Sequence, residues 1–227
     1  MTSLANTALP IDIEHVRFNM IEQQIRTWEV LDPTVLDLLL RVHREDFVPE
    51  QHRALAFVDM EIPLGHGETM LSPKLEARML QALAVQPGDA ILEIGTGSGY
   101  MTALLASLGR HVYSVDIVPD FTRAAAARLT ASGINNVTPE TGDAARGWDK
   151  HEPYDIIVLT GSVPVLSDKF QQSLKPGGRL LAIVGTAPVM QAQLITRALG
   201  GACSSVTLFE TCIAPLKNAP QPQHFIF

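Results

Sequence analysis

The chain has 227 residues, of which 46% are apolar and 18% are charged. This length and composition suit one compact globular domain with a real core and exclude a disordered chain. The formal net charge of −7 argues against nucleic acid as a partner, because phosphate backbones attract basic surfaces.

The sequence points to neither a membrane nor a metal. The N-terminus has no basic-then-apolar signal, and no apolar run reaches the ~18 residues that a membrane span needs. The seven histidines are scattered without the spacing of zinc ligands, so we expect no metal site. The expectation is a cytoplasmic protein without a membrane partner.

Helical patterns dominate the first third of the chain. Residues 1–10 are weakly patterned and predict a frayed tail, and apolar residues at helical spacing predict a helix over 13–28. Asp32 before Pro33 predicts the start of a second helix, and residues 44–59 look irregular. The stretch "GHGETMLSPK", 65–74, predicts a loop before a third helix over 75–83. Residues 1–85 are therefore predicted to form a helical N-terminal cap that includes this loop.

Short strands and helices alternate from Ala90 onward. We expect strands near 90–95, 111–117, 136–143, 154–161 and 179–185, with helices over 100–109, 120–133 and 167–178. Such alternation is typical of a mostly parallel sheet with right-handed crossovers. Residues 191–199 and 204–213 flank two glycines and predict an antiparallel hairpin at the sheet edge. The predicted fold is a three-layer α/β sandwich with its core in residues 86–227.

The segment "LEIGTGSGY" places a glycine-rich turn between a strand and a helix. Gly95, Gly97 and Gly99 alternate with Thr96 and Ser98, in a spacing tighter than the dinucleotide G-x-G-x-x-G pattern. Without side chains at the glycines, a ligand can approach the backbone and the helix N-terminus. Taken alone, such a turn can also be a plain strand–helix connection.

Two aspartates follow the next two strands at the same sheet edge. Asp116 lies 23 residues after Glu93 and can accept hydrogen bonds from two ribose hydroxyls. Asp143 in "TGDA" follows the third strand, where its carboxylate could accept a hydrogen bond from an adenine amino group. Each aspartate could instead be a helix N-cap, but both together with the glycine turn favour a binding site.

These motifs resemble a known family. "EIGTGSG", the acidic residue that closes "VYSVD", and "TGDA" are similar to the Rossmann-like S-adenosylmethionine (SAM)-dependent methyltransferases. "FVP", "IPLGHGET", "LEIGTGSGY" and "YDIIV" narrow the resemblance to the protein-L-isoaspartate (D-aspartate) O-methyltransferases. The resemblance implies SAM as cofactor, S-adenosylhomocysteine (SAH) as product, and isoaspartyl-containing proteins or peptides as partners; it leaves the oligomeric state open. It implies a cofactor site made of His66, Gly67, Glu68, Thr69, Glu93, Gly95, Thr96, Gly97, Ser98, Gly99, Asp116, Ile117, Gly142, Asp143 and Ala144.

The implied reaction needs no general base. Its acceptor is a carboxylate, which titrates near ~3.5–4 and is already an ionised nucleophile at neutral pH. The remaining demands are in-line positioning of the two groups and exclusion of water. A catalytic histidine is therefore not expected.

The sequence departs from the family pattern in the 65–74 loop. Where the family has a serine that faces the methyl donor, this chain has Leu71, and the nearest hydroxyls belong to Thr69 and Ser72. We take Thr69 and Ser72 as catalytic candidates, although the one-residue shift from Leu71 favours Ser72 as the cap of the helix that starts at Pro73. Leu71, Thr160 and Gly161 are the expected substrate contacts, and "TGSVP" after Leu159 also departs from the family.

Two alternatives and the C-terminus stay open at this point. The chain could be a methyltransferase of the same fold with another acceptor, or a weakly catalytic SAM-binding adaptor. The proline-containing C-terminal segment predicts an extended strand laid over the domain with Phe225 and Phe227 tucked in, or else a tail that docks on a partner.

Overall fold

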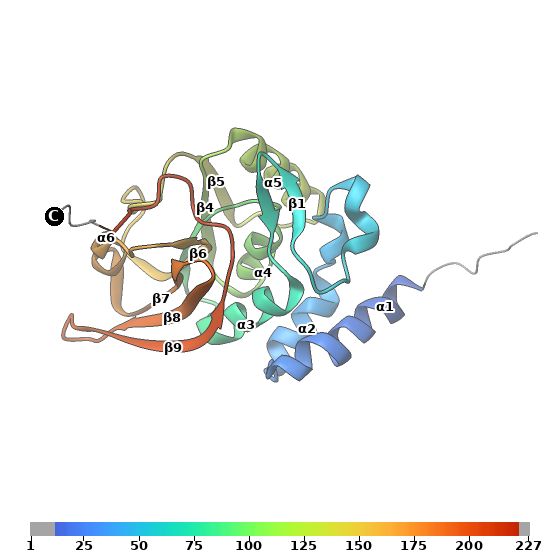
Figure 1. Ribbon diagram of the computed structural model, residues 1–227, viewed down its shortest axis with the longest axis horizontal. Coiled ribbons are helices and arrows are strands. Elements are labelled where there is room, and N and C mark those ends of the chain that lie inside the picture. Colours follow the sequence, from blue (N-terminus) through green and yellow to red (C-terminus); the bar gives the residue numbers. More distant parts are fainter. Residues whose placement is uncertain (1–11, 223–227) are drawn as a thin grey trace, which may run out of the picture.

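The computed structural model describes residues 12–222, so the predicted tail over 1–10 and the predicted packing of Phe225 and Phe227 lie outside the described residues. A seven-stranded sheet in the order β5-β4-β3-β6-β7-β8-β9 forms the centre (Figure 1). Pairing is parallel from β5 to β7 and antiparallel from β7 to β9, which confirms the predicted sheet. The strands are β3 (Ala90–Ile94), β4 (His111–Asp116), β5 (Val137–Thr141), β6 (Tyr154–Val163), β7 (Leu174–Thr186), β8 (Val189–Arg197) and β9 (Cys203–Thr211).

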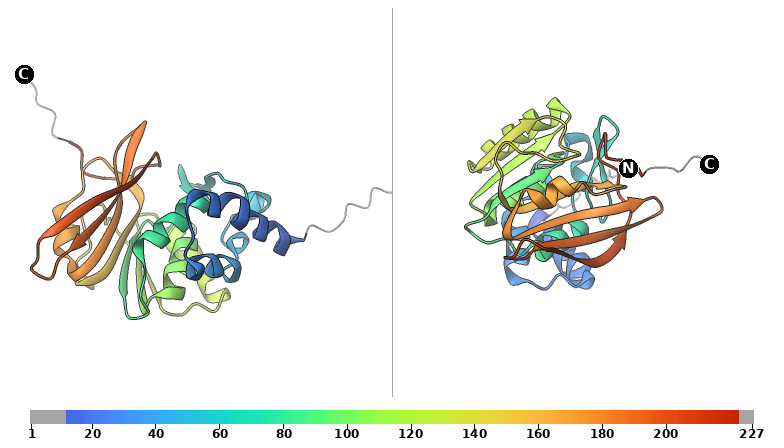
Figure 2. Two further views of the ribbon diagram at one scale, coloured as in Figure 1. Left: turned by 90° about the horizontal axis from the view of Figure 1, so that it is seen from below. Right: turned by 90° about the vertical axis from the view of Figure 1, so that its left-hand side faces the viewer.

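Side chains that alternate along the strands build two cores, one on each face of the sheet. In β6, Ile156 and Val158 join one buried cluster, while Ile157 and Leu159 join the other. The first cluster also takes in the N-terminal helices, α3 (Pro73–Leu83) and α4 (Tyr100–Leu108), and the second includes Phe170 of α6 (Asp168–Gln172). Since successive strand residues point to opposite faces, this pattern requires cover on both sides and gives the predicted three layers. Figure 2 shows the N-terminal helices on the side of the molecule away from β8 and β9.

The N-terminal helices form where the sequence predicts them. Helix α1 (Ile13–Met20) continues as a π-helical segment, Ile21–Ile25, and a 3-10 turn, Arg26–Trp28. Helix α2 (Pro33–Arg41) begins at an Asp32 cap whose side chain accepts a hydrogen bond from the Thr34 N–H at 2.8 Å. Among the described residues, no helix is both long and apolar enough to cross a membrane.

The stretch predicted as a loop is a β-hairpin. Strands β1 (Ile62–Gly65) and β2 (Glu68–Met70) pair antiparallel, and Gly65 lies opposite Glu68. Both turn residues have positive φ, 54° at His66 and 80° at Gly67, as two-residue hairpin turns of the primed type require. The glycine at the second turn position makes this turn possible, and α3 then starts at Pro73.

The other corrections concern the second half of the core. Helix α4 and helix α5 (Pro119–Ala131) match their predictions, but α6 ends at Gln172 instead of running to the glycines. Leu174 already pairs with Tyr154 of β6, so strand pairing replaces the helical turn before Pro176. The predicted antiparallel hairpin is confirmed as β8 and β9 at the edge of the sheet.

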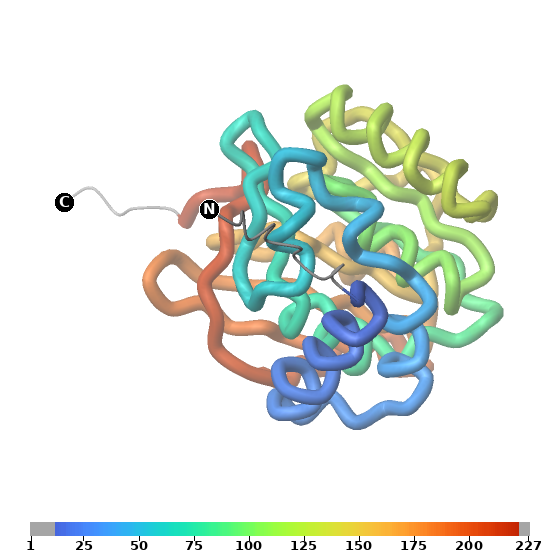
Figure 3. The backbone as a smooth tube through the Cα atoms, turned by 90° about the vertical axis from the view of Figure 1, so that its right-hand side faces the viewer, coloured from blue at the N-terminus to red at the C-terminus, as the bar shows by residue number. Residues whose placement is uncertain are grey.

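The segment after β9 lies extended over the sheet edge, as expected, for the residues described. The Ser162 N–H donates to the Ala214 carbonyl at 2.9 Å, and the Leu216 N–H donates to the Ser162 carbonyl at 2.8 Å. Figure 3 shows this segment, in red, running beside the β1–β2 hairpin, in cyan. Two segments far apart in the sequence therefore meet above the carboxyl ends of the parallel strands.

Candidate functional site

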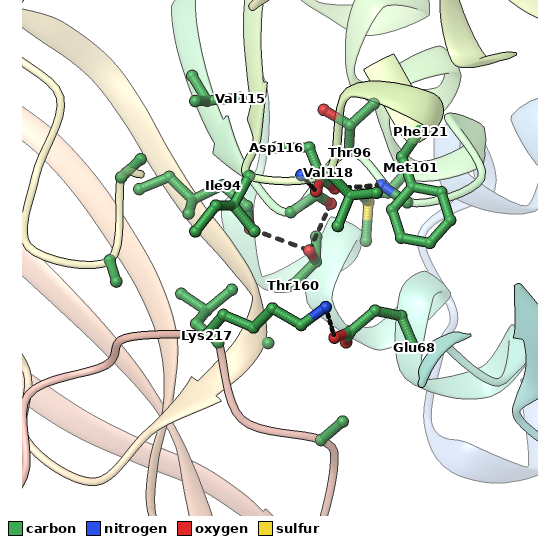
Figure 4. A pocket seen from close by; sticks show the side chains of 18 of the residues that line it. Glu68, Ile94, Thr96, Met101, Val115, Asp116, Val118, Phe121, Thr160 and Lys217 are labelled. Atoms are coloured by element: carbon green, nitrogen blue, oxygen red, sulfur yellow. Dashed lines mark hydrogen bonds and ion pairs between the residues drawn. The ribbon is translucent and has the colours of Figure 1, made fainter. Parts of the chain in front are cut away.

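A cavity lies at the carboxyl ends of β3, β4 and β6, under the hairpin and the C-terminal segment (Figure 4). This is the edge at which open α/β sheets bind their ligands. Most predicted site residues line it: Glu68, Thr69, Leu71, Gly95, Thr96, Gly97, Ser98, Asp116, Ile117, Gly142, Asp143, Ala144, Thr160 and Gly161. His66, Gly67, Ser72, Glu93 and Gly99 were also predicted but do not line the cavity.

The glycine turn needs its glycines for two different reasons. Gly95, Gly97 and Gly99 all have positive φ, at 97°, 50° and 86°, a region that side-chain-bearing residues rarely adopt. In addition, a Cβ on Gly95 would lie 2.2 Å from Thr160 Oγ1. That hydroxyl donates to the carbonyls of Ile94 at 3.0 Å and Gly95 at 2.6 Å, so Thr160 fixes the backbone of the turn.

The two aspartates, Asp116 and Asp143, form part of the cavity wall, and neither is the N-cap of a helix. Asp116 accepts from the Gly97 N–H at 3.0 Å and from the Val118 N–H at 2.9 Å. Burial raises the pKa of Asp116 above its usual value, against the opposing effect of these two N–H donors. Asp143 accepts from the Ala145 N–H at 3.1 Å and from the Asn218 side-chain amide at 2.9 Å. The helix-cap alternative is thereby set aside, because the residue before α5 is Val118.

Glu93 supports the turn from below instead of lining the cavity. Its carboxyl is fully buried and accepts hydrogen bonds from the Thr102 hydroxyl at 2.5 Å and the Ser114 hydroxyl at 2.6 Å. Burial raises its pKa to about 8, although both hydroxyls oppose the shift. The group is mostly protonated at neutral pH and links β3, α4 and β4 beneath the turn.

The hairpin and the start of α3 place Leu71 in the wall of the cavity. Its side chain is 7% exposed, and its carbonyl accepts from Arg44 Nη2 at 2.6 Å. The Thr69 hydroxyl donates to Glu61 Oε2 at 2.7 Å, so that hydrogen is already used within the chain. Ser72 occupies the N-cap position of α3, but its side chain makes no capping hydrogen bond and lies outside the cavity lining. The Ser72 hydroxyl therefore lies outside the cavity lining that contains Leu71.

His66 and Gly67 form the tip of the hairpin. The His66 ring lies 3.2 Å from an Asp120 carboxylate oxygen and packs edge-on against Phe121. This contact fastens the hairpin tip to the start of α5 and leaves neither turn residue in the cavity wall.

Sequence reasoning missed Glu76 in the cavity wall. Glu76 is 2% exposed, and its carboxyl forms an ion pair with Arg44, which also stacks on the ring of Tyr100 at 5.2 Å. Burial raises the pKa of Glu76 above its usual value, against the opposing effect of the Arg44 charge and hydrogen bond. A signal was available in the sequence: Glu76 lies three residues before Met79 and seven before Leu83. This spacing places an acidic side chain on the apolar face of α3.

The C-terminal residues Pro215, Leu216 and Lys217 were also missed as wall residues. No local pattern in the sequence marks them as wall residues, because their position follows from pairing with β6. Met101 and Phe121 add apolar surface on the opposite side of the cavity (Figure 4).

The sheet order, the glycine turn at its carboxyl edge and the two following aspartates are the arrangement of the Rossmann-like SAM-dependent methyltransferases. Within the described residues, the cavity wall carries four acidic side chains (Glu68, Glu76, Asp116 and Asp143) against one basic side chain (Lys217). This charge balance and the glycine cradle fit a cationic sulfonium cofactor, so the residues present suit the cofactor of this class.

Comparisons with known proteins narrow the class to one family. A model of the family described as Protein-L-isoaspartate(D-aspartate) O-methyltransferase matches residues 16–219. A protein-L-isoaspartate O-methyltransferase from Myxococcus xanthus is 40% identical over 197 residues, which cover 86% of this chain and 93% of that relative. One from Gloeobacter violaceus is 36% identical over 206 residues, which cover 90% of this chain and all of the relative, 100%. The chain belongs to the protein-L-isoaspartate(D-aspartate) O-methyltransferase family, which uses SAM.

Solved structures share the fold. A structure named protein-L-isoaspartate O-methyltransferase superposes with a TM-score of 0.76 at 22% identity, over 91% of this chain and 66% of that chain. A putative family member from Plasmodium falciparum, solved with SAH, gives a TM-score of 0.73 at 19% identity, over 90% of this chain and 97% of that chain.

Proposed function

We propose that the protein transfers a methyl group from SAM to the free carboxylate of L-isoaspartyl and D-aspartyl residues in damaged proteins. The observation that carries the proposal is the family match over residues 16–219, which spans nearly the whole described chain and every predicted site residue. The substrate is therefore a protein or peptide, and the product side is SAH and a methyl ester.

We assign parts of the cofactor to the residues that line the cavity. Gly95 and Gly97 would seat the methionine part, Asp116 the ribose hydroxyls and Asp143 the adenine amino group. The support for this assignment is their order along the carboxyl edge of β3, β4 and β5, together with carboxylate oxygens at the cavity wall. Leu71, Thr160 and Gly161 would face the acceptor.

The chain's own residues supply orientation and water exclusion. Gly95, Gly97, Asp116 and Asp143 would hold SAM, which would supply an electrophilic methyl group on a sulfonium for the acceptor carboxylate. The acceptor carboxylate is ionised at neutral pH, so no residue has to remove a proton. Arg44 holds the Leu71 backbone, which keeps the apolar Leu71 side chain at the cavity wall, and Thr160 holds the glycine turn. Rigid positioning of this kind can supply several kcal/mol, roughly up to 7–11, of the barrier reduction.

The direct test uses two peptides that differ only in one linkage. The protein is incubated with methyl-labelled SAM and an isoaspartyl peptide, beside the same peptide with a normal aspartyl residue. We expect base-labile label on the isoaspartyl peptide alone, because its product is a carboxyl methyl ester. SAM binding without transfer to either peptide would refute the proposal and leave a methyltransferase with another acceptor or a SAM-binding adaptor.

A cytoplasmic location and the absence of nucleic-acid and membrane partners stay predictions from the sequence. The proposed activity does not depend on them.

A further inference from the structure

The side chain of Lys217 reaches across the mouth of the cavity. Its Nζ lies 3.0 Å from Glu68 Oε1 and 3.3 Å from the His66 carbonyl oxygen, and the Lys217 side chain is 42% exposed. Figure 4 shows Lys217 and Glu68 meeting below Thr160 in that view. The two backbone hydrogen bonds between Ser162 and the C-terminal segment hold Lys217 in this position.

The acceptor of the proposed reaction is an anion that must enter an acidic cavity. Within the described residues of the wall, Lys217 is the one basic side chain against four carboxyl groups. Glu76 is paired with Arg44 and Glu68 with Lys217 itself, so Asp116 and Asp143 are the carboxyl groups without an ion-pair partner among the described residues. Like charges at short range repel an entering carboxylate, and screening is weaker in a partly enclosed site than in bulk water. A positive group at the mouth offsets this repulsion where the acceptor passes.

The nearby hydroxyls offer little help to that carboxylate. Leu71 has no hydroxyl, the Thr69 hydroxyl donates to Glu61, and the Thr160 hydroxyl donates to the turn carbonyls. An ammonium has three N–H donors. The Lys217 ammonium donates one of these hydrogens to the His66 carbonyl and forms an ion pair with the Glu68 carboxylate, and it has no further hydrogen-bond partner among the described residues.

We propose that Lys217 binds the carboxylate of the acceptor residue and is a specificity-determining residue for the reaction. This inference rests on the proposed function, since it names how that acceptor is recognised. Glu68 holds the ammonium at the cavity mouth while the acceptor is absent and competes with the acceptor for it. The His66 carbonyl anchors the same ammonium to the hairpin tip.

The chemistry sets which kinetic constant changes. Negative charge on the acceptor oxygen decreases as the O–CH₃ bond forms, so a cation that binds the carboxylate favours the ground state at least as much as the transition state. Loss of Lys217 should therefore raise the KM for the acceptor and leave kcat nearly unchanged.

Three variants and one matched control test the inference. Lys217→Met removes the charge, Lys217→Arg keeps it, and Glu68→Gln removes the competing carboxylate. Lys175→Met is the control, because Lys175 pairs with Asp155 at 2.6 Å with similar exposure, 35% and 25%, at the opposite ends of the strands. Charge-assisted hydrogen bonds, reduced for the partial exposure, predict a roughly tenfold rise in acceptor KM for Lys217→Met, with the KM for SAM within about twofold.

The Glu68→Gln variant distinguishes acceptor binding by Lys217 from a purely structural role of the Lys217–Glu68 ion pair. If Lys217 binds the acceptor, Glu68→Gln lowers the acceptor KM, whereas Lys217→Met raises it. If the Lys217–Glu68 ion pair only stabilises the position of the hairpin over the cofactor, Lys217→Met and Glu68→Gln weaken SAM and SAH binding by the same factor. Both variants then leave the acceptor KM unchanged. The second pattern overturns the inference.

A binding measurement tests the role of Lys217 independently of whether the protein transfers a methyl group. Fluorescence anisotropy of the SAH complex is measured with a labelled isoaspartyl peptide and with its twin, in which the free carboxylate is an amide. We expect Lys217→Met to weaken only the carboxylate peptide, while Lys175→Met changes neither. Equal weakening of both peptides, or no binding of the carboxylate peptide to the unaltered protein, overturns the inference. Lys217-dependent carboxylate binding without methyl transfer would uphold the inference and refute the proposed function.

Discussion

Replacing Leu71 with serine tests whether a hydroxyl at this position would orient the acceptor. Leu71 lines the cavity, and Arg44 fixes its carbonyl at 2.6 Å, so a shorter side chain at this position keeps the same backbone position. A serine there would present its hydroxyl to the acceptor side of the cavity. Because misplacement by about 1 Å can cost a factor of ~10² in rate, we expect Leu71→Ser to raise kcat/KM for the isoaspartyl peptide by about tenfold to a hundredfold.

The same change weakens the fold, which has to be separated from its effect on the rate. Leu71 is only 7% exposed, and truncating a buried leucine to alanine costs ~2–5 kcal/mol. Leu71 borders an open cavity and so belongs at the lower end of that range. A loss of ~2 kcal/mol corresponds to a fall of roughly 4–8 °C in Tm for a chain of this size.

Leu71→Ala is the matched control, because it loses the same packing and gains no hydroxyl. Both variants and the unaltered protein are assayed with the isoaspartyl peptide at saturating SAM, well below their Tm values. We expect Leu71→Ser to exceed the unaltered protein, and Leu71→Ala to equal it or fall below it. Equal rates for the serine and alanine variants would refute the reasoning, because the gain would then come from space and not from a hydroxyl.

Three further predictions concern buried ionisable groups. Arg44→Met leaves the Glu76 carboxyl buried without its partner and should cost ~3–5 kcal/mol in urea unfolding near pH 7, and a loss below ~1 kcal/mol would contradict the buried ion pair. Burial raises the pKa of Glu93 from 4.5 to about 8, so the folded state keeps a proton that the unfolded state releases, and stability falls as pH rises through this window. Glu93→Gln should flatten that fall when urea unfolding is compared at about pH 5 and pH 8, and an unchanged slope would assign the pH dependence to other groups. Asp116→Asn should weaken SAH binding about tenfold or more by calorimetry, since charged hydrogen bonds contribute ~1.5–3 kcal/mol, and an unaltered Kd would remove Asp116 from the cofactor site.

The parallel sheet and the glycine turn could be predicted because their signals are local. Each strand is a short apolar run next to a helical run, and the turn is defined by glycines in one nine-residue segment. Both aspartates could be placed as well, because the carboxyl ends of adjacent parallel strands share one edge. These predictions need only the direction of the chain and the periodicity of its apolar residues, and a single sequence contains both.

The hairpin and the end of α6 could not be predicted from local pattern. Glycines around His66 are compatible with an open loop or a tight turn, and only the pairing of Ile62 with Met70 decides between them. Residues 173–178 read as the end of a helix, but the partner strand takes Leu174 into β7. In both cases a tertiary contact decides between two structures that the local sequence allows.

The missed wall residues depend on contacts between distant segments. Arg44 and Glu76 are 32 residues apart, and Lys217 lies 151 residues from the His66 carbonyl to which it donates. Glu93 is the opposite case: its position beside the turn predicts a cofactor contact, but its carboxyl is fully buried beneath the turn and does not line the cavity. Burial and the direction of a side chain follow from the packing of helices on strands, which a motif does not encode.

The departure at Leu71 is compatible with the family's reaction because of the acceptor's own chemistry. An ionised carboxylate needs no base, so a hydroxyl in the wall orients the acceptor but takes no proton from it. Orientation can come from any segment that reaches the same face of the cavity, and the C-terminal segment does so through its pairing with Ser162. An acceptor-binding group in another segment is therefore compatible with a leucine at this position. Lys217 is the described wall residue with the charge for that role.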